Sequence, residues 1–293
     1  MARRKPAATH GVCVVDKPAG VTSHDVVGML RRRFHERQIG HAGTLDPDET
    51  GVLVFAVGMA TRLLRFVGDS RKRYTGEVVL GVETDTLDAS GTVLATHDMS
   101  AVTVDDVRRV AAERLTGDIM QVPPMVSALK VAGKRLHQLA REGVEVERPP
   151  RPVTVWRFDV EPGPEPGVVA VDVECSSGTY VRTLAADLGA LLGGGAHLRN
   201  LRRTAVGDFT IGEAADPDSC RLMPVASAVR SLPAVTVDDE TVGLIGNGRV
   251  LPAWDGAGPW AVFAPDGRLV AVYEAFHGRA AKPSVVLPDH APG

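Results

Sequence analysis

The stretch Gly40-His41-Ala42-Gly43-Thr44-Leu45-Asp46-Pro47-Asp48-Glu49-Thr50-Gly51 decides how the rest of the chain is interpreted. It is polar and turn-rich, and it leads directly into an apolar run over residues 52–57 that predicts a buried strand. Glycine tolerates positive φ, and Pro47 moves the residue before it out of the helical region. We therefore expect a short loop that holds Asp46 in an extended conformation at the edge of a core, where a reactive carboxylate could be fixed.

Residue types alone leave the role of Asp46 open. It either caps a turn, as aspartate commonly does, or serves as a reactive carboxylate. Asp48 lies two residues further on, so a glycosidase-type pair of carboxyl groups is a third reading. Across Pro47 in an extended loop we expect the two side chains to diverge, which argues against that pair.

Several other short motifs surround this stretch. Lys17 follows a predicted strand over residues 11–15 and precedes a predicted helix over residues 24–34, with Thr22 or Ser23 as its cap. Alternation predicts strands over residues 73–81, 153–161 and 168–175, and a helix begins near residue 180. Taken one at a time, their polar and aromatic residues are explained by ordinary structural roles: a solvated lysine, a half-buried tyrosine, a turn histidine.

Together, however, the motifs resemble a known family. G-H-A-G-T-L-D-P-x-x-T-G-V-L is similar to the catalytic-aspartate motif of the TruB family of bacterial tRNA pseudouridine synthases. D-K-P-x-G-x-x-S, Y-x-x-x-x-x-L-G and C-S-x-G-T-Y-V-R match further family motifs in the expected order. The resemblance covers roughly residues 11–215 and is weaker after about 233. Ser177 stands where many members carry lysine, which puts one phosphate contact of the family in doubt.

The resemblance implies an α+β fold with a mixed, mainly antiparallel sheet. It implies a catalytic domain over 11–230 and a small β-rich, PUA-like RNA-binding domain over 233–293. The basic residues at the N-terminus predict a disordered tail over residues 1–10. A thumb-like insertion at about 120–150, with a helix near 135–143, is expected to close over RNA.

The resemblance also implies three catalytic residues. Asp46 acts at C1′ or C6 of the target uridine, as a covalent nucleophile or as a base in a glycal route, and the sequence does not choose between them. Arg182 pairs with Asp46, and a guanidinium there can grip both oxygens of the carboxylate. Tyr74 is the candidate to remove the C5 proton late in the reaction, a role that requires tuning of a phenol that normally titrates near ~10.

Five further residues are expected to bind the RNA. By resemblance, a histidine fills the place that the flipped nucleotide leaves, a tyrosine stacks on the extruded base, a leucine lines the base pocket, and lysines meet phosphate. In this chain these are His41, Tyr180, Leu201, Lys130 and Lys17.

Charge alone gives a weaker signal. The formal net charge of −3 over 293 residues argues mildly against a nucleic-acid partner. The basic residues are nevertheless clustered along the sequence, and the clusters flank the candidate motifs. We expect them to form a phosphate-binding surface that includes residues 31–33, Arg62, Arg65, residues 71–73, Lys134, Arg135, Arg199, Arg202 and Arg203.

The function implied is isomerisation of the T-loop uridine of tRNA (position 55) to pseudouridine, with the T stem-loop as partner. The reaction is redox-neutral, so we expect no cofactor, and no motif for a metal is present. Three distant cysteines predict a reducing, cytoplasmic location, and the lack of an apolar run of about 20 residues argues against a membrane span. We also expect a monomer. The rivals are a non-catalytic tRNA-binding or tRNA-folding protein on the same scaffold, and a hydrolase that cleaves nucleosides.

Overall fold

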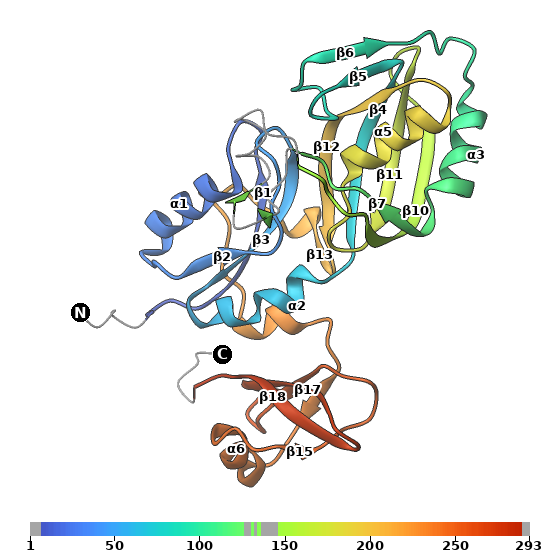
Figure 1. The fold of residues 1–293 in the computed structure, drawn as a ribbon. Coiled ribbons are helices and arrows are strands. Elements are labelled where there is room, and N and C mark those ends of the chain that lie inside the picture. The colour runs from blue at the N-terminus through green and yellow to red at the C-terminus, as the bar shows by residue number, and fades with distance from the viewer. Residues whose placement is uncertain (1–6, 126–129, 132–133, 136–145, 289–293) are drawn as a thin grey trace.

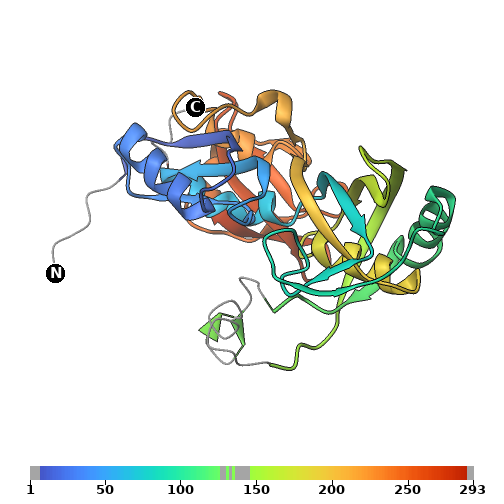
Figure 2. The same cartoon turned by 90° about the horizontal axis from the view of Figure 1, so that it is seen from above.

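The structure is a computed structural model, and it describes residues 7–125, 130–131, 134–135 and 146–288. A nine-stranded sheet forms the upper part of the molecule in Figure 1, and a five-stranded sheet lies below it. Viewed from above, α1 and α3 lie at opposite ends of the large sheet (Figure 2). The molecule is therefore elongated along that sheet.

The large sheet has the order β1-β3-β12-β4-β11-β10-β7, with β2 added beside β3 and β13 beside β12. All its pairings are antiparallel except the one between β12 and β3. The predicted mixed, mainly antiparallel α+β fold is confirmed. The strands are β1 (Gly11–Lys17), β2 (Ile39–His41), β3 (Thr50–Val57), β4 (Lys72–Leu80), β7 (Gly117–Gln121), β10 (Arg151–Pro162), β11 (Val168–Cys175), β12 (Ala196–Val206) and β13 (Phe209–Thr210).

Three helices bury the apolar side chains of one face of this sheet, in a single hydrophobic cluster. They are α1 (Ser23–Phe34), α3 (Val104–Arg114) and α5 (Val181–Leu191). The first two begin with capping boxes, in which a threonine at the N-cap and an aspartate three residues later bond each other's backbone. The opposite face of β1 and β3 packs on the helical turns η1 (Gly58–Leu63), α2 (Leu64–Gly68) and η3 (Val225–Val229).

The parallel pairing of β12 with β3 joins the two halves of the large sheet. Its register pairs Arg202 with Thr50 and Arg203 with Gly51. The backbones approach so closely that a Cβ on Gly51 would lie 2.2 Å from the carbonyl oxygen of Arg203, and Gly51 has φ of +102°. Only glycine fits both the conformation and the space.

Gly51→Ala is accordingly expected to destabilise the protein by about 2–4 kcal/mol, the sum of positive-φ strain and a backbone clash. Thermal unfolding measures this loss. Gly167→Ala is the matched control, because Gly167 also has positive φ (+77°) but has open space where the Cβ would be. It should cost only about 1 kcal/mol. Equal losses in the two variants would show that the strand contact contributes nothing.

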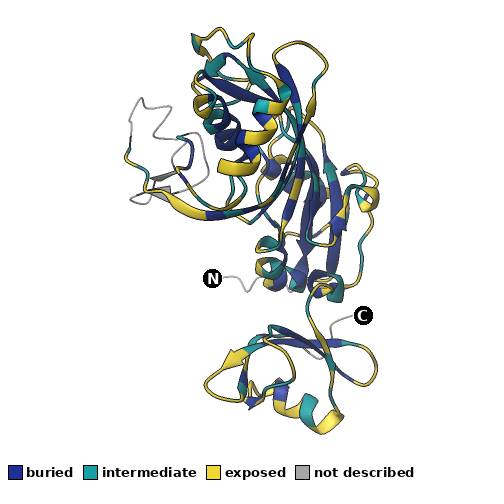
Figure 3. Ribbon diagram, turned by 90° about the vertical axis from the view of Figure 1, so that its right-hand side faces the viewer, coloured by how far each residue is buried: buried dark blue, intermediate teal, exposed yellow. Residues whose placement is uncertain are grey.

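The smaller sheet comprises residues near the C-terminus and shares a core with the larger one. A single hydrophobic cluster contains Val54 of β3, Val229 of η3 and Val272 of β17. Arg65 also contacts Glu274 at 2.5 Å, and Figure 3 shows the smaller sheet lying beneath the buried strands. Its elements are β14 (Ala234–Thr236), α6 (Asp239–Gly246), β15 (Leu251–Pro252), β16 (Trp260–Phe263), β17 (Leu269–Phe276) and β18 (Ala280–Val286).

The remaining elements are short. β5 (Val82–Thr84) pairs with β6 (Val93–Thr96), β8 (Lys130–Val131) pairs with β9 (Lys134–Arg135), and Ile211–Glu213 form a further 3₁₀ turn, η2. The expected helix near 135–143 and most of the thumb-like insertion lie outside the described residues. Among the helices that are described, none is long and apolar enough to cross a membrane.

The expected disordered tail over residues 1–10 overlaps with residues that the structure describes. Residues 1–6 are not described, but Ala8 and His10 make specific contacts. The amide of Ala8 donates to Glu36 Oε2 at 3.1 Å, and His10 Nδ1 accepts from the amide of Met59 at 3.1 Å. The prediction of a disordered tail up to residue 10 is therefore wrong for these residues.

Candidate active site

The loop between β2 and β3 carries Asp46, and a neighbouring helix fixes the residue before it. Ser23, the first residue of α1, bonds Leu45 twice: its hydroxyl donates to the Leu45 carbonyl at 2.9 Å and accepts from the Leu45 amide at 3.0 Å. Both side chains are buried. The predicted helix start at residues 22–23 thus has a second use, because it anchors the loop next to Asp46.

Lys17 holds the residue after Asp46. Its ammonium group is fully buried and donates to the carbonyls of Pro47 (2.9 Å), Pro18 (2.8 Å) and Val21 (2.7 Å). Three donors on three carbonyls use the bonding capacity of the group. The expectation that Lys17 meets phosphate, and the alternative of a solvated lysine, are both contradicted. Lys17 is a structural support for the Asp46 loop.

Residues 46–49 form a tight turn with Pro47 at its second position, where proline is favoured. The amide of Glu49 donates to the Asp46 carbonyl at 3.2 Å. In return, Glu49 Oε2 accepts from the amide of Asp46 at 2.8 Å. Glu49 thus contacts Asp46 directly. Asp48 is exposed at the tip of the turn. From the sequence, Asp48 was the second carboxyl group considered beside Asp46, and Glu49 was not identified.

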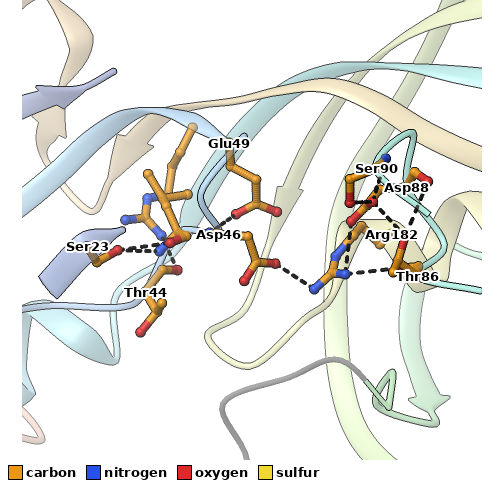
Figure 4. A network of polar contacts seen from close by, with 10 residues as sticks. Ser23, Thr44, Asp46, Glu49, Thr86, Asp88, Ser90 and Arg182 are labelled. Carbon is orange, nitrogen blue, oxygen red and sulfur yellow. Dashed lines mark hydrogen bonds and ion pairs between the residues drawn. The ribbon is translucent and has the colours of Figure 1, made fainter. Parts of the chain in front are cut away.

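Arg182, buried at the start of α5, brings the two halves of the site together (Figure 4). Its Nη2 donates to Asp46 Oδ2 at 2.6 Å, which is the pairing predicted from the resemblance. Its Nη1 donates to Asp88 Oδ2 and to the carbonyl of Thr86, both at 3.0 Å. The guanidinium fork expected on Asp46 is therefore shared with a second carboxylate, and it can hold Asp46 in a fixed direction.

Asp88 was not identified as a site residue. Its Oδ1 accepts from the hydroxyls of Thr86 (2.7 Å) and Ser90 (2.5 Å) and from the Ser90 amide (3.0 Å), while Oδ2 faces Arg182. These bonds fix the orientation of Asp88, which in turn positions the arginine. The only local signal was its position at the end of the polar T-D-T-L-D run over residues 84–88.

Asp46 and Arg182 line a cavity of about 240 Å³. Tyr74, Tyr180 and Leu201 also line it, so the structure brings together five of the predicted site residues. A second cavity of about 400 Å³ shares Asp46, Arg182 and Leu201 with the first. A carboxylate beside aromatic and apolar walls is the arrangement that a flat, polar base can enter and stack in.

Tyr74 is a buried phenol in this cavity. Burial raises the pKa of Tyr74 to about 12, although the nearby Arg203 acts in the opposite direction. The side chain is therefore neutral near pH 7. This shift is opposite in direction to the tuning that a proton-abstracting phenolate would require.

Two basic residues on strands complete the wall. Burial, with Arg203 as a further cause, lowers the pKa of Lys72 to about 8, and its ammonium donates to the Gly68 carbonyl at 2.9 Å. Arg203 is buried and donates to the carbonyls of Val52 (2.8 Å) and Gly43 (3.0 Å). Lys72 points to the same strand face as the tyrosine two residues later, a signal that strand periodicity offered.

One predicted binding residue lies apart from this group. His41 lies on β2 with its ring edge-on to Phe55, 5.9 Å between centroids, and it is not among the residues lining either cavity. Burial lowers the pKa of His41, so the ring is neutral at pH 7. Lys130 begins β8, but its side chain is outside what the structure describes.

The expected phosphate-binding surface is smaller than the sequence clusters suggested. Arg199 contacts Glu77 at 2.6 Å, and Arg202 contacts Asp16 at 2.7 Å. Carboxylates thus already neutralise part of the predicted basic surface. The arginines at 31–33 are exposed on α1. Clustering along the sequence did not reveal these partners, because each comes from a distant strand.

Comparison with known proteins identifies the chain. The family described as "TruB family pseudouridylate synthase (N terminal domain)" matches residues 31–181. The chain belongs to the TruB family. Two further TruB descriptions, "tRNA pseudouridylate synthase B C-terminal domain" and "tRNA Pseudouridine synthase II, C terminal", match residues 182–230 and 232–288. The resemblance seen in the motifs is confirmed over most of the chain.

TruB relatives of similar length support the same assignment. A protein from Rhodococcus jostii (strain RHA1) named "tRNA pseudouridine synthase B" is 45% identical, covering 98% of this chain and 98% of the relative. One of the same name from Symbiobacterium thermophilum (strain DSM 24528 / JCM 14929 / IAM 14863 / T) is 49% identical over 83% of both chains.

Solved structures show the TruB fold at greater distance. A chain from "Crystal Structure of a Cbf5-Nop10-Gar1 Complex" superimposes with a TM-score of 0.70 at 26% identity, covering 92% of this chain and 79% of that chain. One from "Structure of H/ACA RNP bound to a substrate RNA containing 2'-deoxyuridine" gives 0.71 at 24% identity, covering 96% and 87%. The second likeness speaks for the fold alone.

Proposed function

We propose that this protein is a tRNA pseudouridine synthase that converts the T-loop uridine at tRNA position 55 to pseudouridine. The observation that carries the proposal is the Asp46 carboxylate, held 2.6 Å from Arg182 at the wall of a cavity that also presents Tyr74 and Leu201. The names of the relatives support the same activity. The site supplies what the reaction needs from a protein: a fixed carboxylate and a pocket for an extruded base.

The reaction breaks the N1–C1′ bond of uridine, turns the uracil and joins C5 to C1′. The proton at C5 is lost and N1 gains one, so the atoms of the nucleotide are conserved and no electrons are exchanged. Asp46 either adds to the sugar or takes a proton from it to form a glycal, and both routes need the ionised carboxylate. Arg182 stabilises that charged form and fixes its direction.

The aromatic residues hold the base in this proposal. A uridine inside a folded loop must leave the stack before its C1′ can be reached. Tyr74, as a neutral phenol, and Tyr180 provide flat surfaces for the uracil, and Leu201 closes the pocket. The Tyr180 backbone is itself fixed, because its amide donates to Gln121 Oε1 at 2.8 Å and its carbonyl accepts from Gln121 Nε2 at 3.1 Å. Tyr74 stays the candidate to accept the C5 proton, and because its pKa is raised the phenol must first give up its own proton.

The proposal extends to organisation and partners. Residues 11–230 would hold the catalytic machinery and residues 233–293 would form a PUA-like surface for tRNA, whose T stem-loop enters the cavity. His41 would contact the RNA from outside the cavity, and Lys130 would meet phosphate. We propose a monomer that works in the cytoplasm, where its three cysteines, all buried, stay reduced.

The test is tritium release from tRNA that contains C5-tritiated uridine. We expect release of about one equivalent per tRNA, since one C5 proton is lost per isomerisation, and no release from a transcript with cytidine at position 55. A protein that only binds tRNA would retain the transcript and release nothing. A nucleoside-cleaving hydrolase would instead produce free uracil, and either result would overturn the proposal.

A further inference from the structure

Glu49 occupies an unusual place in the site. It lies three residues after Asp46, and its carboxylate accepts the Asp46 amide at 2.8 Å, closing the turn that also contains Pro47. It lines both cavities that meet at the Asp46–Arg182 pair. In Figure 4 its carboxyl group lies beside the side chain of Asp46. No step described so far uses this group.

The hydrogen bond from the Asp46 amide to Glu49 affects the orientation of the Asp46 side chain. The side chain of Asp46 leaves the Cα atom next to the N–H group that donates to Glu49. This hydrogen bond therefore restricts the backbone orientation from which the Asp46 side chain points. Ser23 and Lys17 fix the residues on either side of Asp46, at Leu45 and Pro47. Glu49 supplies the remaining contact, to the backbone of Asp46 itself.

We propose that Glu49 is a positioning residue whose ionised carboxylate fixes the backbone of Asp46 and thereby holds the Asp46 carboxylate against Arg182. An ionised acceptor forms a stronger hydrogen bond with an amide than a neutral one does. Protonation of Glu49 would therefore loosen the turn. The inference rests on the proposed function for its kinetic consequences.

The surroundings of Glu49 make its charge adjustable near neutral pH. Burial, followed by the negative charge of Asp46, raises the pKa of Glu49 to about 7, while the Asp46 amide and two arginines act in the opposite direction. Below pH 7 the group is thus mainly protonated, and above pH 7 it is ionised. The charged and titratable groups that act on it from other elements are Arg182 on α5, Arg203 on β12, Tyr74 on β4 and Lys17 on β1.

The kinetic test compares pH profiles of single-turnover tritium release at saturating enzyme. The wild-type rate should rise on the order of tenfold between pH 6 and pH 8, following ionisation of Glu49. Glu49→Gln keeps the size and a neutral acceptor but cannot titrate, so its rate should vary less than about twofold over that range. At pH 8 it should be at least roughly tenfold slower than wild type, because it represents the neutral form at every pH. Asp48→Asn, which removes the exposed carboxylate next in sequence, should keep the wild-type profile.

A profile of Glu49→Gln that still rises like the wild type would overturn the inference, as would a wild-type profile that is flat from pH 6 to pH 8. Circular dichroism checks that the variant is folded. Loss of tritium release in the wild type at every pH would instead contradict the proposed function, so the two failures are distinguishable.

A second measurement needs no activity. In protein labelled with ¹³C at the glutamate side-chain carboxyl, one resonance should titrate near pH 7 and be missing in Glu49→Gln. Asp46→Asn removes the neighbouring charge and should move that transition to lower pH, because the charge of Asp46 is one cause of the raised value. Absence of a resonance that titrates near neutrality, or a transition unmoved by Asp46→Asn, would show that the two carboxyl groups do not interact.

Discussion

Asp46→Asn is expected to reduce single-turnover tritium release by roughly 10⁴-fold or more, as removal of a reacting group does in other enzymes. The amide has the shape of the carboxylate but can neither add to C1′ nor take a proton from the sugar. The contacts that hold the loop, from Ser23 to Leu45 and from Lys17 to Pro47, do not involve the Asp46 side chain. The fold should therefore survive the change.

Two controls separate chemistry from binding. Asp46→Asn should bind tRNA within a few-fold of wild type and melt at a similar temperature. Asp48→Asn, at an exposed carboxylate two residues away, should react at the wild-type rate. If Asp46→Asn turned over within a few-fold of wild type, Asp46 would lose its assignment as the catalytic carboxylate.

Arg182→Met is expected to have the next largest effect, because it removes the partner of two carboxylates at once. The side chain of Arg182 is only 5% exposed, whereas that of Asp46 is 39% exposed, so solvent relieves part of the uncompensated charge. We expect a stability loss of about 3 kcal/mol, at the lower end of what breaking a buried pair costs. The single-turnover rate should fall roughly a hundredfold or more, because Asp46 is no longer held in place.

Arg182→Lys tests whether the two-sided contact of the guanidinium with Asp46 and Asp88 matters, and Arg157→Met is its control. Lysine keeps the charge but cannot reach Asp46 and Asp88 together, so we expect a loss of roughly tenfold in rate. Arg157 also contacts two carboxylates, but it is 41% exposed on the sheet surface. Arg157→Met should cost less than about 1 kcal/mol and leave the rate unchanged. Reaction of bound Arg182→Lys at the wild-type rate, with an unchanged pH profile, would exclude the pairing as a catalytic requirement.

Much of the fold was accessible from the sequence, because the elements that matter most have strong local signals. The apolar run over residues 52–57 lies within β3. Helix α3 begins where the sequence has a capping-box pattern, with Thr103 as N-cap and Asp106 three residues later. The tail was less predictable, since Ala8 is held by Glu36, a contact between residues 28 apart. The parallel pairing of β12 with β3 also had no local sequence signal other than the glycine at position 51.

The site residues likewise differ in how far the sequence could predict them. Asp46 and Arg182 could be paired from the family resemblance, although 136 residues separate them. Lys17, Asp88 and Glu49 could not be assigned, because their roles depend on which carbonyl, guanidinium or amide the fold brings next to them. Lys17 shows the difficulty most clearly: a lysine in a turn is normally solvated, and only the three surrounding carbonyls make its burial favourable.

The junction between β3 and β12 has a consequence for how this enzyme can evolve. Asp46 precedes β3 in one half of the large sheet, whereas Arg182 begins the helix that packs on β12 in the other half. A small rotation of one half against the other would change the distance between the two side chains without altering either. Substitutions along this strand junction, at residues that pack on β3 and β12 without lining the cavity, could therefore adjust the reaction rate. Natural variation there would be read as neutral by any comparison confined to the residues that touch substrate.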